Sequence, residues 1–390
     1  MTKIWSNSGD SHYMEPPDLF ETNLPKSMAE RMPRSVKDPD GQYETIYVDG
    51  QTIRRKIPSV LRKPGTDGQT MADASMSRTT GGIDMEVRLA DLDQEGIWAE
   101  VMYPSLGVWS WLIRDPELDQ AGTRLANDWV FDTVVKCSPR LLPTARLSML
   151  SVDNTVAELQ RCAGLGFKIV ALPVELPEWQ DDINQPYWEP LWSAAEEAGI
   201  VVGFHVGAGV IGKLDPYRGP GSVIINYVET SYPAQRAANK MVASGVLERH
   251  PGLKVLISEG GASWVPFIGD RMNEAYRQHS GFVRPPLAAA PKEILYRQVY
   301  ASFQHDESAI GAVTSQGYRN VMWGSDYPHL EGTFGHTQET LHGLFDDVDP
   351  EVSYRIRIGA FCELFPDAGE PPGESEGEKV ETSTVRAGIN

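Results

Sequence analysis

The chain has 390 residues, and its 35 Lys and Arg against 54 Asp and Glu give a formal net charge of −19. This acidity excludes nucleic acid as the main partner, because phosphate binding requires clustered Lys and Arg, and it disfavours docking on anionic membranes. No apolar run approaches the roughly 18 residues of a transmembrane helix, so no membrane span is expected.

The N-terminal segment MTKIWSNSGDSH has no apolar core of the kind that a secretory signal carries. The three cysteines, Cys137, Cys162 and Cys362, show neither a disulfide framework nor metal-ligand spacing. Together these features predict a cytoplasmic protein whose partner is a small-molecule substrate.

Short apolar runs of β type alternate with longer helix-like stretches. The candidate strands are residues 3–10, 98–104, 141–149, 167–174, 201–207, 254–261, 298–304 and 320–328. The candidate helices are residues 117–135, 152–163, 187–198, 232–247 and 306–315. Such alternation predicts a parallel sheet covered on both faces, and eight units favour an α/β fold closed into a (β/α)8 TIM barrel. A doubly wound open sheet is the alternative, although its Gly-rich first turn is missing.

Three segments do not fit the repeat. Residues 21–88 are polar and predict an insertion after the first strand that covers the barrel mouth; within it, residues 43–57 alternate around Asp49-Gly50 and predict a hairpin. Residues 213–230 predict a mobile loop near the site. Residues 366–390 are rich in Gly, Pro and Glu and predict a disordered acidic tail, which leaves residues 1–365 as a single domain.

Active sites of TIM barrels lie at the carboxyl ends of the strands, so titratable side chains there are the candidates for chemistry. These side chains are Asp10, His12, His205, Glu259, His305, Asp326 and His329. Asp10 and His12 are separated by one residue and therefore face the same side of a strand, where both could bind one cation. An Asp–His hydrogen bond in a turn is the alternative for this pair.

The remaining candidates also have alternatives. His205 lies in GFHVGAG, whose glycines allow a ligand to approach; a buried His with a backbone partner is the other interpretation. Asp326 is interpreted as a metal ligand or proton acceptor rather than a helix N-cap. The buried charge of Glu259 requires a partner, either a metal or an arginine such as Arg271. His250, His279 and His342 are expected on the surface, and His336 at a helix turn.

Four segments carry a resemblance to a known family: GDSHYMEPPDLF, GFHVG, HPGLKVLISEGGASWVP and NVMWGSDYPHLEGTF. The chain resembles the amidohydrolase-related group (amidohydrolase 2) of the amidohydrolase superfamily, in the branch that includes aminocarboxymuconate-semialdehyde decarboxylase. The resemblance implies a distorted TIM barrel with one or two divalent metals and a homodimer. It also implies either hydrolysis of amides, esters or lactones or non-oxidative decarboxylation, and it places the ligands at Asp10, His12, His205 and Asp326.

The chain departs from the decarboxylase pattern at two positions. The first ligand is Asp10, where those members often have His or Glu, and strand six carries Glu259 where they have His. A donor set this rich in oxygen makes Fe or Mn as suitable as Zn. Glu259 could bridge two ions, with His305 or His329 completing the ligand set of the second ion.

The leading hypothesis is therefore a metal-dependent hydrolase of an ester, thioester, amide or lactone, in which Asp326 or Glu259 transfers the proton. The alternatives are a metal-dependent decarboxylase of an aromatic or unsaturated acid and a non-catalytic binding protein. The residues expected to contact substrate are Trp109, Arg218, Tyr227 and Phe334. Arg114 and Arg236 compete with Arg218 for a substrate carboxylate.

Overall fold

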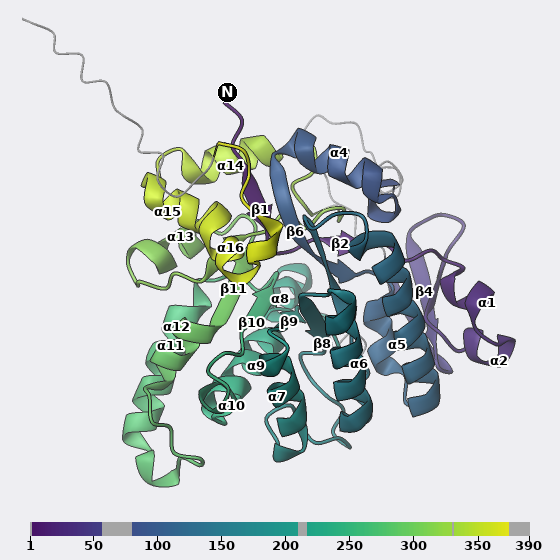
Figure 1. The fold of residues 1–390 in the computed structure, drawn as a ribbon, viewed down its shortest axis with the longest axis horizontal. Coiled ribbons are helices and arrows are strands. Elements are labelled where there is room, and N and C mark those ends of the chain that lie inside the picture. Colours follow the sequence, from purple (N-terminus) through teal and green to yellow (C-terminus); the bar gives the residue numbers. More distant parts are fainter. Residues whose placement is uncertain (1, 57–79, 210–216, 330, 374–390) are drawn as a thin grey trace, which may run out of the picture.

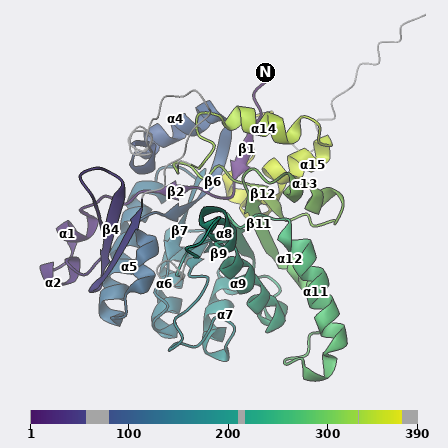
Figure 2. The same cartoon turned by 180° about the vertical axis from the view of Figure 1, so that it is seen from behind.

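The strands form a nearly closed parallel barrel. The computed structural model describes residues 2–56, 80–209, 217–329 and 331–373 (Figures 1 and 2). The strands are β1 (Ser6–Ser8), β6 (Ile97–Pro104), β7 (Leu141–Arg146), β8 (Ile169–Leu172), β9 (Val201–His205), β10 (Val255–Ser258), β11 (Val299–Phe303) and β12 (Val321–Trp323), in this order around the sheet, with β2 (His12–Tyr13) also paired to β6.

Backbone contacts between the two ends of the sheet close the barrel. The N–H of Gly9 donates to the carbonyl of Trp323 at 2.8 Å, and Ser11 forms a parallel bridge with Tyr327. The predicted (β/α)8 barrel is thus confirmed and the open-sheet alternative is wrong. The strands read as continuous apolar runs because they are buried from β6 to β12 almost without interruption.

Helices surround the barrel and bury one apolar face against the strands (Figure 1). Their bounds are α4 (Met85–Glu95), α5 (Pro116–Val130), α6 (Val152–Leu165), α7 (Glu189–Glu197), α9 (Tyr232–Ala243), α10 (Val246–Arg249), α11 (Trp264–Gln278), α12 (Pro291–Gln298), α13 (Glu307–Thr314), α14 (Thr337–Phe345), α15 (Pro350–Tyr354) and α16 (Ala360–Leu364). Asp84 and Asp115 cap α4 and α5, because each carboxylate accepts from two free N–H groups of the first turn.

The insertion contains a separate antiparallel sheet. It consists of β3 (Arg34–Lys37), β4 (Tyr43–Val48) and β5 (Gln51–Lys56), preceded by the short helices α1 (Leu19–Asn23) and α2 (Lys26–Ala29). Asp49 and Gly50 have φ of 45° and 75°, as a two-residue hairpin turn of type I′ requires, so the predicted hairpin is confirmed. Residues 57–79 of the predicted insertion lie outside the described residues.

Two predictions about irregular segments are wrong in part. Within residues 213–230, which were expected to form a loop, residues Ser222–Glu229 form helix α8; residues 213–216 are not described. The tail begins with an ordered 3₁₀ helix, Pro366–Ala368, because the indole N–H of Trp98 donates to the carbonyl of Ala368 at 3.0 Å. Residues 374–390 are not described. Across the described segments, no helix has both the length and the apolar content needed to cross a bilayer.

Candidate metal centre and active site

The strand ends bring the predicted titratable side chains together. Asp10 follows β1, His12 begins β2 and His205 ends β9. Glu259 comes directly after β10, and Asp326 comes three residues after β12. Because all strands of the barrel run parallel, these side chains meet at one rim.

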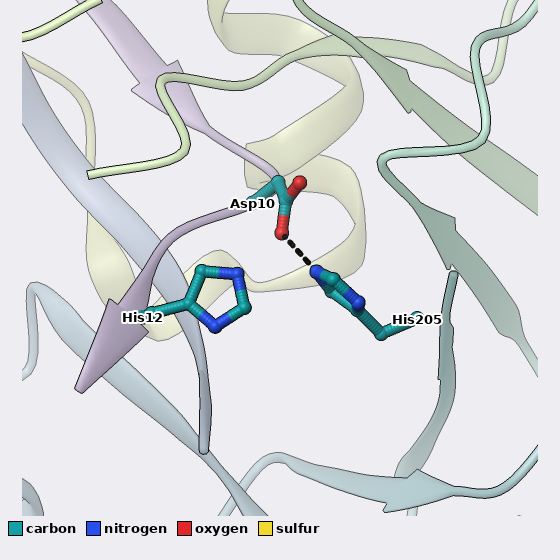
Figure 3. A group of neighbouring side chains, drawn as sticks. All are labelled: Asp10, His12 and His205. Atoms are coloured by element: carbon teal, nitrogen blue, oxygen red, sulfur yellow. Dashed lines mark ion pairs between the residues drawn. The ribbon is translucent and has the colours of Figure 1, made fainter. Parts of the chain in front are cut away.

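Asp10, His12 and His205 form the first compact group (Figure 3). Their ligand atoms lie within 4.8 Å of one another. The Nε2 atom of His205 lies 3.3 Å from Oδ1 of Asp10, and the rings of His12 and His205 meet edge to face with centroids 4.8 Å apart. One cation could contact all three side chains.

Asp326 joins His12 and His329 in a second group. Its Oδ1 atom lies 3.3 Å from Nε2 of His12 and 2.9 Å from Nδ1 of His329. The two imidazole rings stack with centroids 3.8 Å apart. His12 therefore belongs to both groups, which makes it the centre of the site.

Six buried atoms of this cluster have no hydrogen-bond partner of acceptable geometry. They are Oδ1 of Asp10, both ring nitrogens of His12, Nε2 of His205 and both carboxylate oxygens of Asp326. Buried polar atoms in folded proteins nearly always have a partner, and leaving one without costs about 1–3 kcal/mol. A divalent cation would contact such atoms, and mixed imidazole and carboxylate donors suit Mn, Fe or Zn. The residues present thus fit the metal that the resemblance implies.

A backbone contact fixes the orientation of His205. Its Nδ1 atom lies 2.8 Å from the carbonyl oxygen of Val206 and must donate to it. In the neutral imidazole the lone pair is then on Nε2, the atom that faces Asp10. This is the tautomer that a metal ligand needs.

Burial and charge shift the pKa values of the cluster in opposite directions. Burial lowers the pKa of His12 to about 3 and raises the pKa of Glu259 to about 8. Burial also opposes a charge on His205, but Asp10 and Glu259 outweigh it and raise the pKa of His205 to about 10. The carboxylates therefore draw positive charge into the site, which a divalent cation would supply.

Glu259 and Asp326 share an uncommon backbone conformation. Their φ values are 61° and 54°, in the left-handed region that side-chain-bearing residues rarely adopt. Such residues cost about 1–3 kcal/mol and cluster at functional sites. The only other described non-glycine residue with positive φ is Asp49, in the hairpin turn.

Arg88 of α4 fixes the backbone of two ligand segments. It is fully buried and pairs with the equally buried Glu100 of β6. Its Nη1 donates to the carbonyl of His12 at 2.8 Å, and its Nη2 donates to the carbonyl of Tyr327 at 3.4 Å. One side chain thus connects the segment of Asp10 and His12 to that of Asp326.

A cavity of about 200 Å³ adjoins the ligand cluster. His12, His205, Glu259 and His329 line it on the metal side. The other lining residues include Arg55, Tyr103, Trp109, Trp111 and Glu331. The cavity therefore combines titratable groups, one guanidinium and several aromatic rings.

Only one of the four residues predicted to contact substrate lines this cavity. Trp109 does so and is 2% exposed. Arg218 is exposed, and Phe334 packs against Tyr327 with ring centroids 4.8 Å apart. Tyr227 is 64% exposed, although partial burial and then the charge of Glu259 raise its pKa to about 12.

Other predicted residues lie apart from the cluster. His305 is exposed, belongs to none of the described ligand groups, and has its ring stacked on His336 at 6.5 Å. Arg271 contacts Glu274, whereas Glu259 lies 3.5 Å from His205, so the alternative in which Arg271 pairs with Glu259 is wrong.

His250, which the sequence predicts to lie on the surface, is buried, with 7% exposure. Its two ring nitrogens contact Glu196 at 2.9 Å and Glu189 at 3.0 Å. Both carboxylates belong to α7, Glu189 at its start and Glu196 near its end, more than fifty residues earlier in the chain. The local sequence HPGLK gives no sign of them.

Sequence reasoning missed three titratable residues of the cavity wall. Arg55 comes from the predicted hairpin. The prediction that the insertion covers the barrel mouth is the observation from which a hairpin residue in the cavity wall could have been inferred. Tyr103 stands at the end of a predicted strand, with its ring centroid 4.8 Å from that of His205. Glu331 follows His329 by two residues and forms a ligand group with Glu259 and Asp326.

Comparisons with known proteins point to one family. Residues 111–359 match the family model described as amidohydrolase. The curated 2-amino-3-carboxymuconate-6-semialdehyde decarboxylase of Dictyostelium discoideum is 26% identical over 256 residues, which cover 63% of this chain and 67% of that protein.

Solved structures show the same fold at lower identity. An amidohydrolase of Mycobacterium avium subsp. paratuberculosis is 20% identical with a TM-score of 0.76, covering 94% of this chain and 98% of its own. The 5-carboxyvanillate decarboxylase of Sphingomonas paucimobilis is 17% identical with a TM-score of 0.66, covering 93% and 99%. A dihydroxybenzoic acid decarboxylase of Polaromonas, solved with manganese and 2-nitroresorcinol, is 14% identical with a TM-score of 0.61, covering 93% and 97%.

Proposed function

The chain belongs to the amidohydrolase family, and on that premise we propose that it is a metal-dependent, non-oxidative decarboxylase of aromatic or unsaturated carboxylic acids. This exchanges the order of the two leading hypotheses from the sequence. The relative from Dictyostelium and two of the structures with the same fold carry decarboxylase names. A shared fold does not fix the reaction, so the proposal rests on the site as well.

The observation that carries the proposal is the composition of the cavity that adjoins the ligand cluster, which we call the inner cavity. The ligand cluster lies on one side, and Arg55 is the only Arg or Lys among the described lining residues. Trp109 and Tyr103 add aromatic walls that are 2% exposed each. A guanidinium pairs with carboxylates, and aromatic walls suit a planar apolar group. An aromatic or unsaturated acid has both features.

Asp10, His12, His205 and Asp326 would hold the cation, because they contribute the six buried atoms without partners. A divalent ion bound there would hold the substrate oxygens and stabilise negative charge on them. Manganese is the first choice, since the Polaromonas enzyme was solved with it and the donors are imidazole and carboxylate.

The chain's own side chains supply orientation and a proton. The Nε of Arg55 donates to Oε1 of Glu44 at 2.6 Å, so Arg55 would pair with the substrate carboxylate through its Nη atoms, and the aromatic walls would exclude water from the ring. Glu259 lines the cavity, whereas Asp326 is 1% exposed and does not. The Glu259 carboxyl can therefore deliver a proton to the carbon that bears the carboxylate. The bond to that carboxylate then breaks, its electron pair stays with the carbon skeleton, CO2 leaves, and Glu259 recovers a proton from solvent.

Hydrolysis remains the second candidate because of one group of carboxylates. Glu259, Asp326 and Glu331 have oxygens within 4.8 Å of one another, an arrangement that could hold a second cation beside the first. A binuclear centre would suit hydrolysis of an ester, thioester, amide or lactone, the reaction that the sequence favoured.

Product analysis in labelled water separates the two reactions. Manganese-loaded protein is incubated with a panel of hydroxybenzoic and unsaturated acids and with matched methyl esters, in D2O and in H2 18O. Decarboxylation releases CO2 and places deuterium on the carbon that lost it. A carboxylic product that carries 18O, formed without CO2, would instead establish hydrolysis. The Asp326→Asn protein serves as the control for metal-independent turnover.

A further inference from the structure

A second, larger cavity lies next to the inner one. Its volume is about 490 Å³, against about 200 Å³ for the cavity at the ligand cluster. Its lining includes Gln51 and Ile53 of β5, Trp111 and Ile113, and Arg114 and Trp179 at other positions. We call it the outer cavity. The proposed reaction does not use it.

Strand β5 and the segment of the 3₁₀ helix Gly107–Leu112 each contribute residues to both cavities. On β5, Arg55 lines the inner cavity, whereas Gln51, Thr52 and Ile53 line the outer one. Of these residues, Gln51, Ile53 and Arg55 alternate along the strand and so share one face, over about 13 Å from first to last. The 3₁₀ helix Gly107–Leu112 and the residue after it behave likewise: Trp109 lines the inner cavity and Ile113 the outer one.

Trp111 lines both cavities, so one indole stands between them. Its N–H lies 3.3 Å from the carbonyl of Leu147, which accepts from it, and the guanidinium of Arg146 lies 5.7 Å from its ring centroid. Arg146 is itself buried and pairs with Asp119. The indole is therefore held from behind and presents a fixed surface to a ligand.

The volumes indicate that the inner cavity is only part of the binding site. Ligand sites for small molecules usually occupy about 300–1,000 Å³. The inner cavity falls below this range, whereas the two cavities together fall inside it. Trp179 is 57% exposed in the wall of the outer cavity, an unusual position for a large aromatic side chain.

We propose that the outer cavity binds the distal part of the substrate, a planar apolar group about one ring in size that extends past Trp111 and contacts Ile53 and Trp179. The substrate is then an extended organic acid, such as a biaryl acid, rather than a single-ring acid. Arg114, which also lines this cavity, accepts a polar or acidic far end. This inference rests on the proposed function, because it places the carboxylate at Arg55.

The test compares salicylate with a set of phenyl-substituted salicylates in which the second ring occupies each open position. Dissociation constants are measured by calorimetry on manganese-loaded protein. In the wild type, at least one biaryl acid should bind about tenfold tighter than salicylate. In Trp179→Ala this advantage should disappear while the salicylate constant stays unchanged. In Phe282→Ala, which removes an 86% exposed ring that lines neither cavity, the advantage should persist.

Two results would overturn the inference: biaryl acids that bind no tighter than salicylate in the wild type, or a biaryl advantage that survives in Trp179→Ala. Release of CO2 is recorded separately. If no acid of the set loses CO2 but the biaryl preference and its dependence on Trp179 hold, then decarboxylation is refuted and the outer binding site stands.

Discussion

Replacing Arg88 with Met removes a buried cation that serves both the fold and the ligand cluster. Arg88 and Glu100 are both 0% exposed, and the guanidinium also donates to the carbonyls of His12 and Tyr327. Met keeps much of the apolar stem and packs without charge. The substitution therefore leaves Glu100 charged and unpaired and leaves two carbonyls beside the ligands without this donor.

The expected loss of stability is large. Breaking a buried ion pair by removing one partner costs about 3–5 kcal/mol, against a total stability of about 5–15 kcal/mol for a typical domain. The double variant Arg88→Met/Glu100→Met removes the unpaired charge and should regain part of this loss. It should not regain all of it, because a buried acceptor without its donor still costs about 1–3 kcal/mol.

Urea unfolding and manganese titration together test this reasoning. Arg249→Met is the matched control: its pair with Glu189 has side chains 43% and 35% exposed, and such pairs contribute about 1 kcal/mol or less. Manganese affinity should fall about 10–100-fold in both Arg88 variants, since groups that orient metal ligands have effects of this size. A loss below 1 kcal/mol in Arg88→Met, or a double variant less stable than the single one, would refute the argument.

Three further predictions concern the site itself. Glu259→Gln should lower kcat at least about 100-fold while the manganese content by elemental analysis stays unchanged, whereas Asp326→Asn should lower both; loss of manganese in Glu259→Gln would make Glu259 a ligand instead. Arg55→Ala should raise the KM for the acid about tenfold with little change in kcat, while Arg54→Ala, on the other face of β5, should leave KM unchanged in steady-state assays. Chelation should abolish CO2 release and added manganese should restore it; full activity after chelation would exclude the proposed centre.

The barrel and the ligand segments could be read from the sequence because both follow from local patterns. Buried parallel strands are continuous apolar runs, and their carboxyl ends meet at one rim whatever the distance in sequence. Asp10 and His12 needed only the two-residue period of a strand. The structure brings these two together with His205 and Asp326, as the strand ends predicted.

The remaining features depend on contacts between distant segments, and no local pattern records those. Arg55 lines the cavity only because the hairpin lies beside it in three dimensions, and His250 is buried only because Glu189 and Glu196 reach it from another helix. The choice between hydrolysis and decarboxylation depended on Glu259, whose residue type fits both reactions. Its position in the cavity wall, which bears on that choice, appears only in three dimensions.

The hairpin of β4 and β5 separates the proposed substrate selection from the proposed metal binding, because the two depend on different parts of the chain. Every proposed metal ligand comes from the barrel, whereas Arg55 and Ile53, which would select the substrate, come from a fourteen-residue strand pair outside it. Selection can therefore change Arg55, Ile53 or the length of β5 without disturbing the metal chemistry. Transplanting this hairpin between members of the family is a direct route to new substrate ranges on an unchanged catalytic core.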